Sequence, residues 1–231
     1  MKTLLLAMAW TLTAGTLPAT GFAEGAKPTD TAKPADTAKP ADTAKPAEGA
    51  AAASTVAVPA TQKTGPQRVQ VVTSQGNFTI ELNAERAPLT VASFLKYVDQ
   101  GQYTHTLIHR VIANFVIQGG GYDTDYHLKP AATKTFNESG NGLTNSRGTV
   151  GLARSAEPHS GDCQFYVNIG DNNALDPSQA RWGYAVFGKI VDGMDVVDHI
   201  ANRATGPKGP IKEDSPLEPV IIERIERVAS P

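Results

Sequence analysis

The stretch 107–122 restricts the possible folds more than any other part of the chain. Two short apolar runs are separated at Ala113-Asn114, and the second run ends in the triplet Gly119-Gly120-Gly121. Short apolar runs that end in turn-forming residues are typical of β-strands, and glycine lets a strand backbone approach its neighbours closely. The stretch therefore predicts two strands that border one concave surface.

Arg110 lies inside the first of these runs. Regular strand alternation would place its side chain on the face opposite His109 and on the same face as Ile108. One interpretation is an edge-strand arginine whose stem covers apolar surface while its guanidinium stays in water. The other takes Arg110 together with Phe115 and Gln118. These residues would place a planar cation, an aromatic ring and an amide at the rim of one surface.

The rest of the predicted domain consists of similar short segments. Residues 68–74 and 76–83 alternate as a β-hairpin, and a helix with one apolar face begins at Pro88 and ends near Gly101. Further strands are expected at 149–153, 164–169, 185–191 and 219–228, with a second helix at 196–202 and a loop after it. Many short strands and two helices indicate a closed antiparallel barrel, although periodicity alone does not separate a barrel from a sandwich.

Several motifs, in one order, resemble those of a known family. They are HRVI at 109–112, FVIQGGG at 115–121, GTVGLAR at 148–154, QFYVN at 164–168, LD at 175–176 and GYAVFGKIVDGM at 183–194. Over 68–228 the chain resembles the cyclophilin-type peptidyl-prolyl cis-trans isomerases. The resemblance implies a closed eight-stranded antiparallel β-barrel capped by two α-helices, formed by residues 66–231. Side chains fill the interior of so small a barrel, so the site would lie on its outside.

The resemblance also implies the activity, which is isomerisation of the peptide bond that precedes proline. Such a rotation makes and breaks no covalent bond, so no nucleophile, metal or cofactor is expected. A charged donor that stabilises the pyramidal proline nitrogen, next to an apolar pocket for the ring, would suffice. By resemblance, the catalytic residues are Arg110, Phe115 and Gln118, and the peptide-binding residues are Val116, Ala153, Arg154, Gln164, Tyr166, Leu175 and Tyr184.

Four positions depart from the best-known eukaryotic members of that family. Ala174 stands where those proteins carry a tryptophan that contacts cyclosporin, and Arg154 stands in place of an asparagine. Tyr184 replaces a histidine and Val116 replaces a methionine. The departures resemble a bacterial envelope subtype and predict weak cyclosporin binding, which nanomolar affinity in a titration would contradict.

The N-terminal third of the chain has the pattern of a targeting segment followed by a linker. Residues 1–23 contain one lysine, an apolar run and small residues before Ala23, which is the layout of a secretory signal peptide. Residues 24–65 contain six-residue Ala-Lys-Pro repeats that cannot build a core, so this linker is expected to be disordered. We expect export to the periplasm, with secretion as the alternative, and no membrane span after cleavage.

Composition limits the partners. A formal net charge of −2 and scattered basic residues give no indication of nucleic acid as a partner. The single cysteine, Cys163, excludes an internal disulfide, and the five histidines show no ligand spacing that predicts a metal site. The expected partners are proline-containing polypeptides, and a monomer is the expected state because nothing in the sequence indicates assembly.

Two other functions are compatible with parts of the sequence. Cys163 could act as a nucleophile with His109 or His159, although no flanking signature of a cysteine hydrolase is present. Alternatively, the groove could bind proline-containing segments as an interaction module or chaperone, with turnover incidental. Only the apolar pocket would be needed for that second role.

Overall fold

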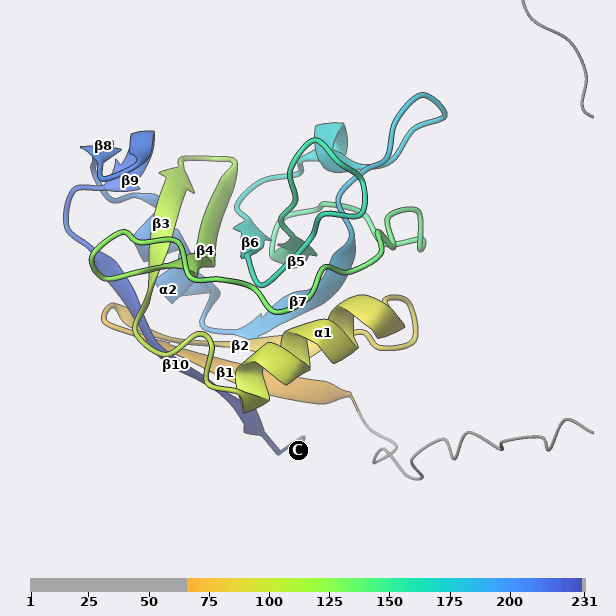
Figure 1. Ribbon diagram of the computed structural model, residues 1–231, viewed down its shortest axis with the longest axis horizontal. Helices are drawn as coiled ribbons and strands as arrows, with labels where there is room; N and C mark the ends of the chain where they lie inside the picture. The colour runs from red at the N-terminus through yellow and green to blue at the C-terminus, as the bar shows by residue number, and fades with distance from the viewer. Residues whose placement is uncertain (1–65, 230–231) are drawn as a thin grey trace, which may run out of the picture. The chain divides into compact units, whose positions relative to one another are not determined.

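The computed structural model describes residues 66–229 (Figure 1). The predicted signal peptide at 1–23 and the predicted linker at 24–65 lie outside the described residues and stay predictions. None of the helices within 66–229 has the length and hydropathy that crossing a bilayer requires.

Eight strands form a closed antiparallel barrel, as the resemblance implied. Around the barrel their order is β1-β10-β3-β4-β6-β5-β7-β2. The strands are β1 (Gln67–Thr73), β2 (Gly76–Leu82), β3 (Thr106–Ile112), β4 (Val116–Asp123), β5 (Thr149–Leu152), β6 (Phe165–Asn168), β7 (Val186–Asp192) and β10 (Val220–Val228). Because β10 pairs with β1, the two ends of the domain meet and leave no open edge there.

Two helices pack against this barrel. Helix α1 (Pro88–Asp99) begins with a proline. Proline has no backbone N–H, but this costs no helical hydrogen bond in the first turn, where N–H groups have no partner within the helix. Its Phe94 reaches the core, with ring centroids 5.7 Å from Phe165 and 5.1 Å from Phe187. Helix α2 (Met194–Ala201) starts two residues earlier than expected and buries Val197 and Ile200 in the same core.

Strand β3 differs from the expected alternation. The pairing of β3 with β4 shifts between Ile108 and Arg110, because two residues on β3 advance against one on β4. This bulge turns Ile108 into the barrel core, whereas Arg110 stays partly exposed. The prediction that Arg110 and Ile108 share a face was therefore wrong. A single extra residue reverses the faces of a strand, and the sequence alternation carries no mark of it.

The loop expected after the second helix contains a small separate sheet. Strands β8 (Thr205–Lys208) and β9 (Ile211–Pro216) pair with each other outside the barrel. Their residues are mostly polar and proline-rich, so they show no alternation that would predict strands. The hairpin lies beside β3, as Figure 1 shows at the end of the molecule where β8 and β9 are drawn.

Candidate functional site

One row of paired residues crosses four strands on the outside of the barrel. Arg110 on β3 pairs with Gln118 on β4, Gln118 pairs with Tyr166 on β6, and Tyr166 pairs with Gly151 on β5. Residues directly opposite each other in an antiparallel sheet project their side chains to the same face. The fold therefore places the predicted arginine, amide and tyrosine on one face, in neighbouring positions.

Beside this row the predicted pocket residues gather into an apolar cluster that is separate from the barrel core. Its buried members are Val116, Ala153 and Tyr166, and its partly buried members are Phe115, Leu175 and Tyr184. We call these six residues the outer cluster. Val116 lies on β4 and Tyr166 on β6, and the other four residues lie in the segments that join the strands, so only the closed barrel brings the six together.

Tyr166 is held firmly within the outer cluster. Gly151 lies under its ring, and a β-carbon at Gly151 would be 2.3 Å from the ring, so only glycine leaves room for it. The Tyr166 hydroxyl donates to Oδ1 of Asn145 at 2.6 Å, and Asn145 Nδ2 donates to Asp176 Oδ1 at 2.8 Å. Burial raises the pKa of Tyr166 far above its usual value, so the hydroxyl keeps its proton. The ring thus forms a rigid wall.

Gln118 pairs with a second amide side chain at the edge of the row. Its Nε2 donates to Oε1 of Gln164 at 3.1 Å. The Gln164 side chain lies against the backbone of Gly121, where a β-carbon would be 2.5 Å from Gln164 Cδ. The hydrogen bonds of the described residues join Gln118 to Gln164 and not to Arg110. The catalytic role of Gln118 therefore stays a prediction.

Arg110 is the residue at the β3 end of the row. Its side chain is 41 % exposed, and its Nε lies 3.7 Å from Oδ2 of Asp214 on β9. This is the ion pair that Arg110 makes among residues 66–229. The rest of its guanidinium can therefore face a ligand.

The guanidinium of Arg154, in contrast, already has partners within the protein. Its guanidinium lies 4.4 Å above the ring of Tyr184 and donates to the backbone carbonyls of Ser155, Trp182 and Gly183. These contacts tie the loop that carries Tyr184 to the end of β5. Several N–H donors of Arg154 are therefore used within the protein, and its guanidinium is held over the Tyr184 ring.

The structure weighs against the cysteine nucleophile. Cys163 is 1 % exposed, and burial raises the pKa of its thiol to about 11, so the thiolate that attacks a substrate is scarce at neutral pH.

A turn at the end of β4 gathers side chains of Asp123, Asp125 and His127 that could supply three metal-ligand atoms. The Asp123 carboxylate there accepts the backbone N–H groups of Asp125 and His127, which is an ordinary role in a turn.

A cavity of about 630 Å³ lies away from the outer cluster, between β2, β7 and the loop at 142–144, and none of the predicted site residues lines it.

Two residues of the site region were not predicted to take part in the site. Asn145 and Asp214 both lie outside the motifs that carry the resemblance.

Comparisons with known proteins agree with this geometry. Residues 68–227 match the family described as cyclophilin type peptidyl-prolyl cis-trans isomerase/CLD. A peptidyl-prolyl cis-trans isomerase of Acinetobacter baylyi is 45 % identical over 158 residues, 68 % of this chain and 84 % of the relative. Peptidyl-prolyl cis-trans isomerase B of Escherichia coli is 45 % identical over 156 residues, 66 % of this chain and 94 % of the relative.

A solved structure agrees at the level of fold. The crystal structure of a Cryptosporidium parvum cyclophilin type peptidyl-prolyl cis-trans isomerase has a TM-score of 0.58 and 24 % sequence identity, and the match covers 72 % of this chain and all of that one. The bacterial relatives also agree with the bacterial subtype that the departures at Ala174 and Tyr184 suggested. The chain therefore belongs to the family of cyclophilin-type peptidyl-prolyl cis-trans isomerases.

Proposed function

We propose that Arg110 accelerates rotation about peptide bonds that precede proline by stabilising the twisted prolyl amide. The chain is a peptidyl-prolyl cis-trans isomerase by family, and the proposal concerns how its residues perform the reaction. The barrier to rotation is about 18–20 kcal/mol because the C–N bond has partial double-bond character. A turnover of about 10³ s⁻¹ needs a barrier of about 13 kcal/mol, so the site must remove roughly 6 kcal/mol.

Loss of conjugation in the twisted state moves electron density onto the proline nitrogen. A guanidinium that donates to this nitrogen stabilises the twisted state more than the planar one, which is the requirement for catalysis. Hydrogen bonds to charged groups contribute about 1.5–3 kcal/mol each. Two such contacts, with orientation of the peptide, are of the right size for the modest barrier reduction.

The other predicted residues have separate roles in this proposal. The proline ring would lie on the outer cluster, where Phe115, Tyr166 and Leu175 supply apolar contacts. The Gln118–Gln164 amide pair would bind the peptide backbone near the acyl group. The single observation that carries the proposal is the paired row, which places Arg110 and Tyr166 on one face with only Gln118 between them.

The test is an isomerase assay on an X-Pro peptide, by NMR exchange or by coupled proteolysis. Arg110→Ala should lower kcat/KM by about a hundredfold, as expected when a donor to a developing charge is removed. Arg224→Ala is the matched control, because Arg224 is an exposed arginine on β10 that pairs only with Glu226 among residues 66–229. An Arg110→Ala enzyme that keeps most of its activity would contradict the proposed mechanism.

A second function, peptide binding without turnover, is favoured by one observation. The outer cluster is assembled without any contribution from Arg110. The Arg110→Ala variant separates the two functions, since a binding role predicts peptide affinity close to that of the wild type after catalysis is lost. Loss of both peptide binding and turnover would contradict a separate binding function and would be consistent with the isomerase role only.

The clients and the location are also proposals. The signal-peptide pattern at 1–23 and the bacterial relatives support folding of exported or envelope proteins in the periplasm as the cellular role. The N-terminal sequence of the protein recovered from the periplasm should begin at Glu24 if cleavage follows Ala23. Recovery only from the cytoplasm would contradict this location.

A further inference from the structure

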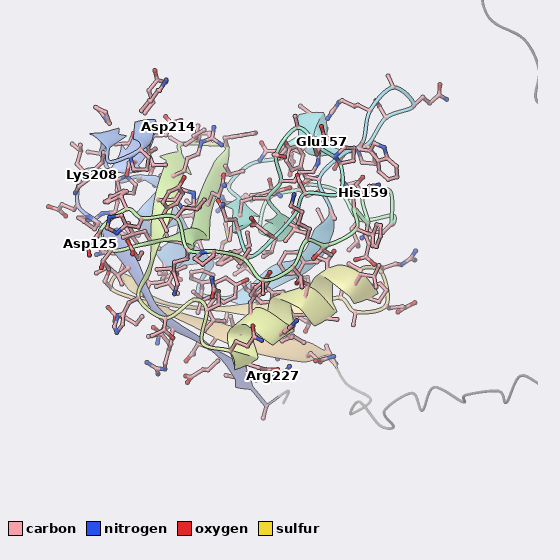
Figure 2. The ribbon with its side chains drawn as sticks, viewed as in Figure 1. Asp125, Glu157, His159, Lys208, Asp214 and Arg227 are labelled. Atoms are coloured by element: carbon pink, nitrogen blue, oxygen red, sulfur yellow. The ribbon has the colours of Figure 1, made fainter. Side chains whose placement is uncertain are left out.

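A carboxylate from outside the barrel faces Arg110. Asp214 belongs to the β8–β9 hairpin, which none of the sequence motifs covers, and its Oδ2 lies 3.7 Å from Nε of Arg110. Figure 2 shows Asp214 at the end of the molecule where β9 lies beside β3. The two side chains are half-buried, with 41 % of Arg110 and 35 % of Asp214 exposed.

The backbone at Asp214 is set by the hairpin. Its φ is 63°, in the left-handed region that few residues other than glycine, asparagine and aspartate adopt readily. Ser215, the next residue, is fully buried, and its Oγ lies within hydrogen-bond distance, 3.2 Å, of the Tyr126 hydroxyl. A non-glycine residue held in such a conformation requires surrounding structure that maintains it.

The hairpin is braced against the loop that follows β4. Gly209 packs against Tyr126 so closely that a β-carbon there would lie 2.7 Å from the tyrosine Cβ. Lys208 Nζ donates to the Leu217 carbonyl at 2.9 Å and lies 5.9 Å from the centre of the Tyr126 ring. Asp214 is therefore carried by an anchored element and not by a free loop.

We propose that Asp214 is a positioning residue that acts through Arg110. A carboxylate at Nε holds one edge of the planar guanidinium and leaves the two terminal nitrogens free to point toward the prolyl amide. Without it, a half-exposed arginine would populate several rotamers, of which only some reach the substrate. The inference depends on the catalytic role proposed for Arg110.

The position of the pair predicts an effect on catalysis and not on stability. Ion pairs at this exposure contribute little to folding, because water screens both charges. Asp214→Asn is the informative variant, since asparagine has the same shape and also tolerates positive φ. We expect kcat/KM to fall about three- to fivefold, a change of the size that exposed charge pairs produce, with most of the loss in kcat.

Three readouts separate positioning from a merely structural role. The denaturation midpoint of Asp214→Asn should match that of the wild type. The ¹⁵N–¹H resonance of Arg110 Nε should shift or broaden, because its anionic neighbour is gone. In an Arg110→Ala background the same substitution should have no further effect on kcat/KM. Asp99→Asn, which breaks the exposed Asp99–Arg227 pair, serves as the matched control and should leave the rate unchanged.

Each outcome decides the inference. An Asp214→Asn enzyme with the wild-type rate or a higher one, or with an unaltered Arg110 Nε resonance, would overturn it. So would an equal loss of activity in the Arg110→Ala background, since Asp214 would then act by another route. Failure of the proposed mechanism looks different, because Arg110→Ala itself would then keep its activity.

Discussion

Gly121 lies beneath the side chain of Gln164, with which a β-carbon at that position would collide. This contact explains one member of the glycine triplet in terms of the site. The missing side chain leaves space in which Gln164 lies flat and accepts the hydrogen bond from Gln118. A residue without a side chain thus determines where a polar side chain of the site can lie.

Gly121→Ala should therefore destabilise the domain by about 1–3 kcal/mol, the usual cost of overfilling a packed site. It should also lower kcat/KM, because Gln164 has to leave the Gln118 amide. In a Gln164→Ala background the clash is gone, so the cost of Gly121→Ala should largely disappear. Denaturant unfolding of the two single variants and the double variant checks this, and additive costs would contradict it.

At the residue scale, the motifs contain the predicted site residues but not the residues that support them. Arg110, Gln118 and Tyr166 were predicted because each lies in a recognisable run. Asn145 and Asp214 were not, because their contacts join residues 21 and 104 positions apart, to Tyr166 and Arg110 respectively. An asparagine or aspartate outside a motif looks the same in the sequence whether or not it holds a distant side chain.

At the scale of secondary structure, the bulge in β3 decides which side chains of that strand face the core and which face the candidate site. It separates Ile108, in the core, from Arg110, outside it, and the residue between them is His109. The His109 ring is 2 % exposed and packs against Tyr122, with ring centroids 4.7 Å apart. Within the described residues its Nδ1 has no hydrogen-bond partner. The element therefore buries a titratable ring next to the proposed catalytic residue.

Burial lowers the pKa of His109 from 6.5 to about 4, and a backbone hydrogen bond to Leu107 only partly opposes this shift. Because the folded-state pKa is the lower one, the unfolded chain takes up a proton first as the pH falls. The stabilisation is complete above about pH 6.5 and is lost as the pH falls toward 4. Between pH 7 and pH 5 the loss should be about 2 kcal/mol, at 1.36 kcal/mol per pH unit.

Denaturant unfolding at pH 7 and pH 5 tests this prediction. His109→Phe keeps a ring against Tyr122 but cannot titrate, so its stability should change much less over that range. Glu81 and Asp99 have lowered pKa values and lose their own contributions only below about 4.5 and 3.8, so they matter little above pH 5. A variant with the same pH dependence as the wild type would show that another group is responsible.

At the scale of the whole molecule, strand β1 closes the barrel. It pairs with β2 on one side and with β10 on the other, so it joins the second and the last strands of the barrel. A chain that begins at Pro66 keeps this closure, whereas one that begins at Ser74 leaves β2 and β10 with unpaired edges. Closure should therefore decide whether the domain folds.

We expect the fragment 66–231 to unfold cooperatively and to keep kcat/KM within about twofold of the chain 24–231, because all eight barrel strands lie within it. The fragment 74–231 should show no cooperative thermal transition and should aggregate. Circular dichroism melts and the isomerase assay measure both outcomes. A folded and active 74–231 fragment would show that barrel closure by β1 is dispensable.

The sequence by itself predicted the family, the eight barrel strands, the two helices, the row members Arg110, Gln118 and Tyr166, and the residues of the outer cluster. It could do so because these features depend on local periodicity and on motifs in a recognisable order. Tertiary structure alone decided which face Ile108 takes, where the β8–β9 hairpin lies and which carboxylate meets Arg110. Those features depend on strand register and on contacts between distant segments, and neither leaves a local pattern in the chain.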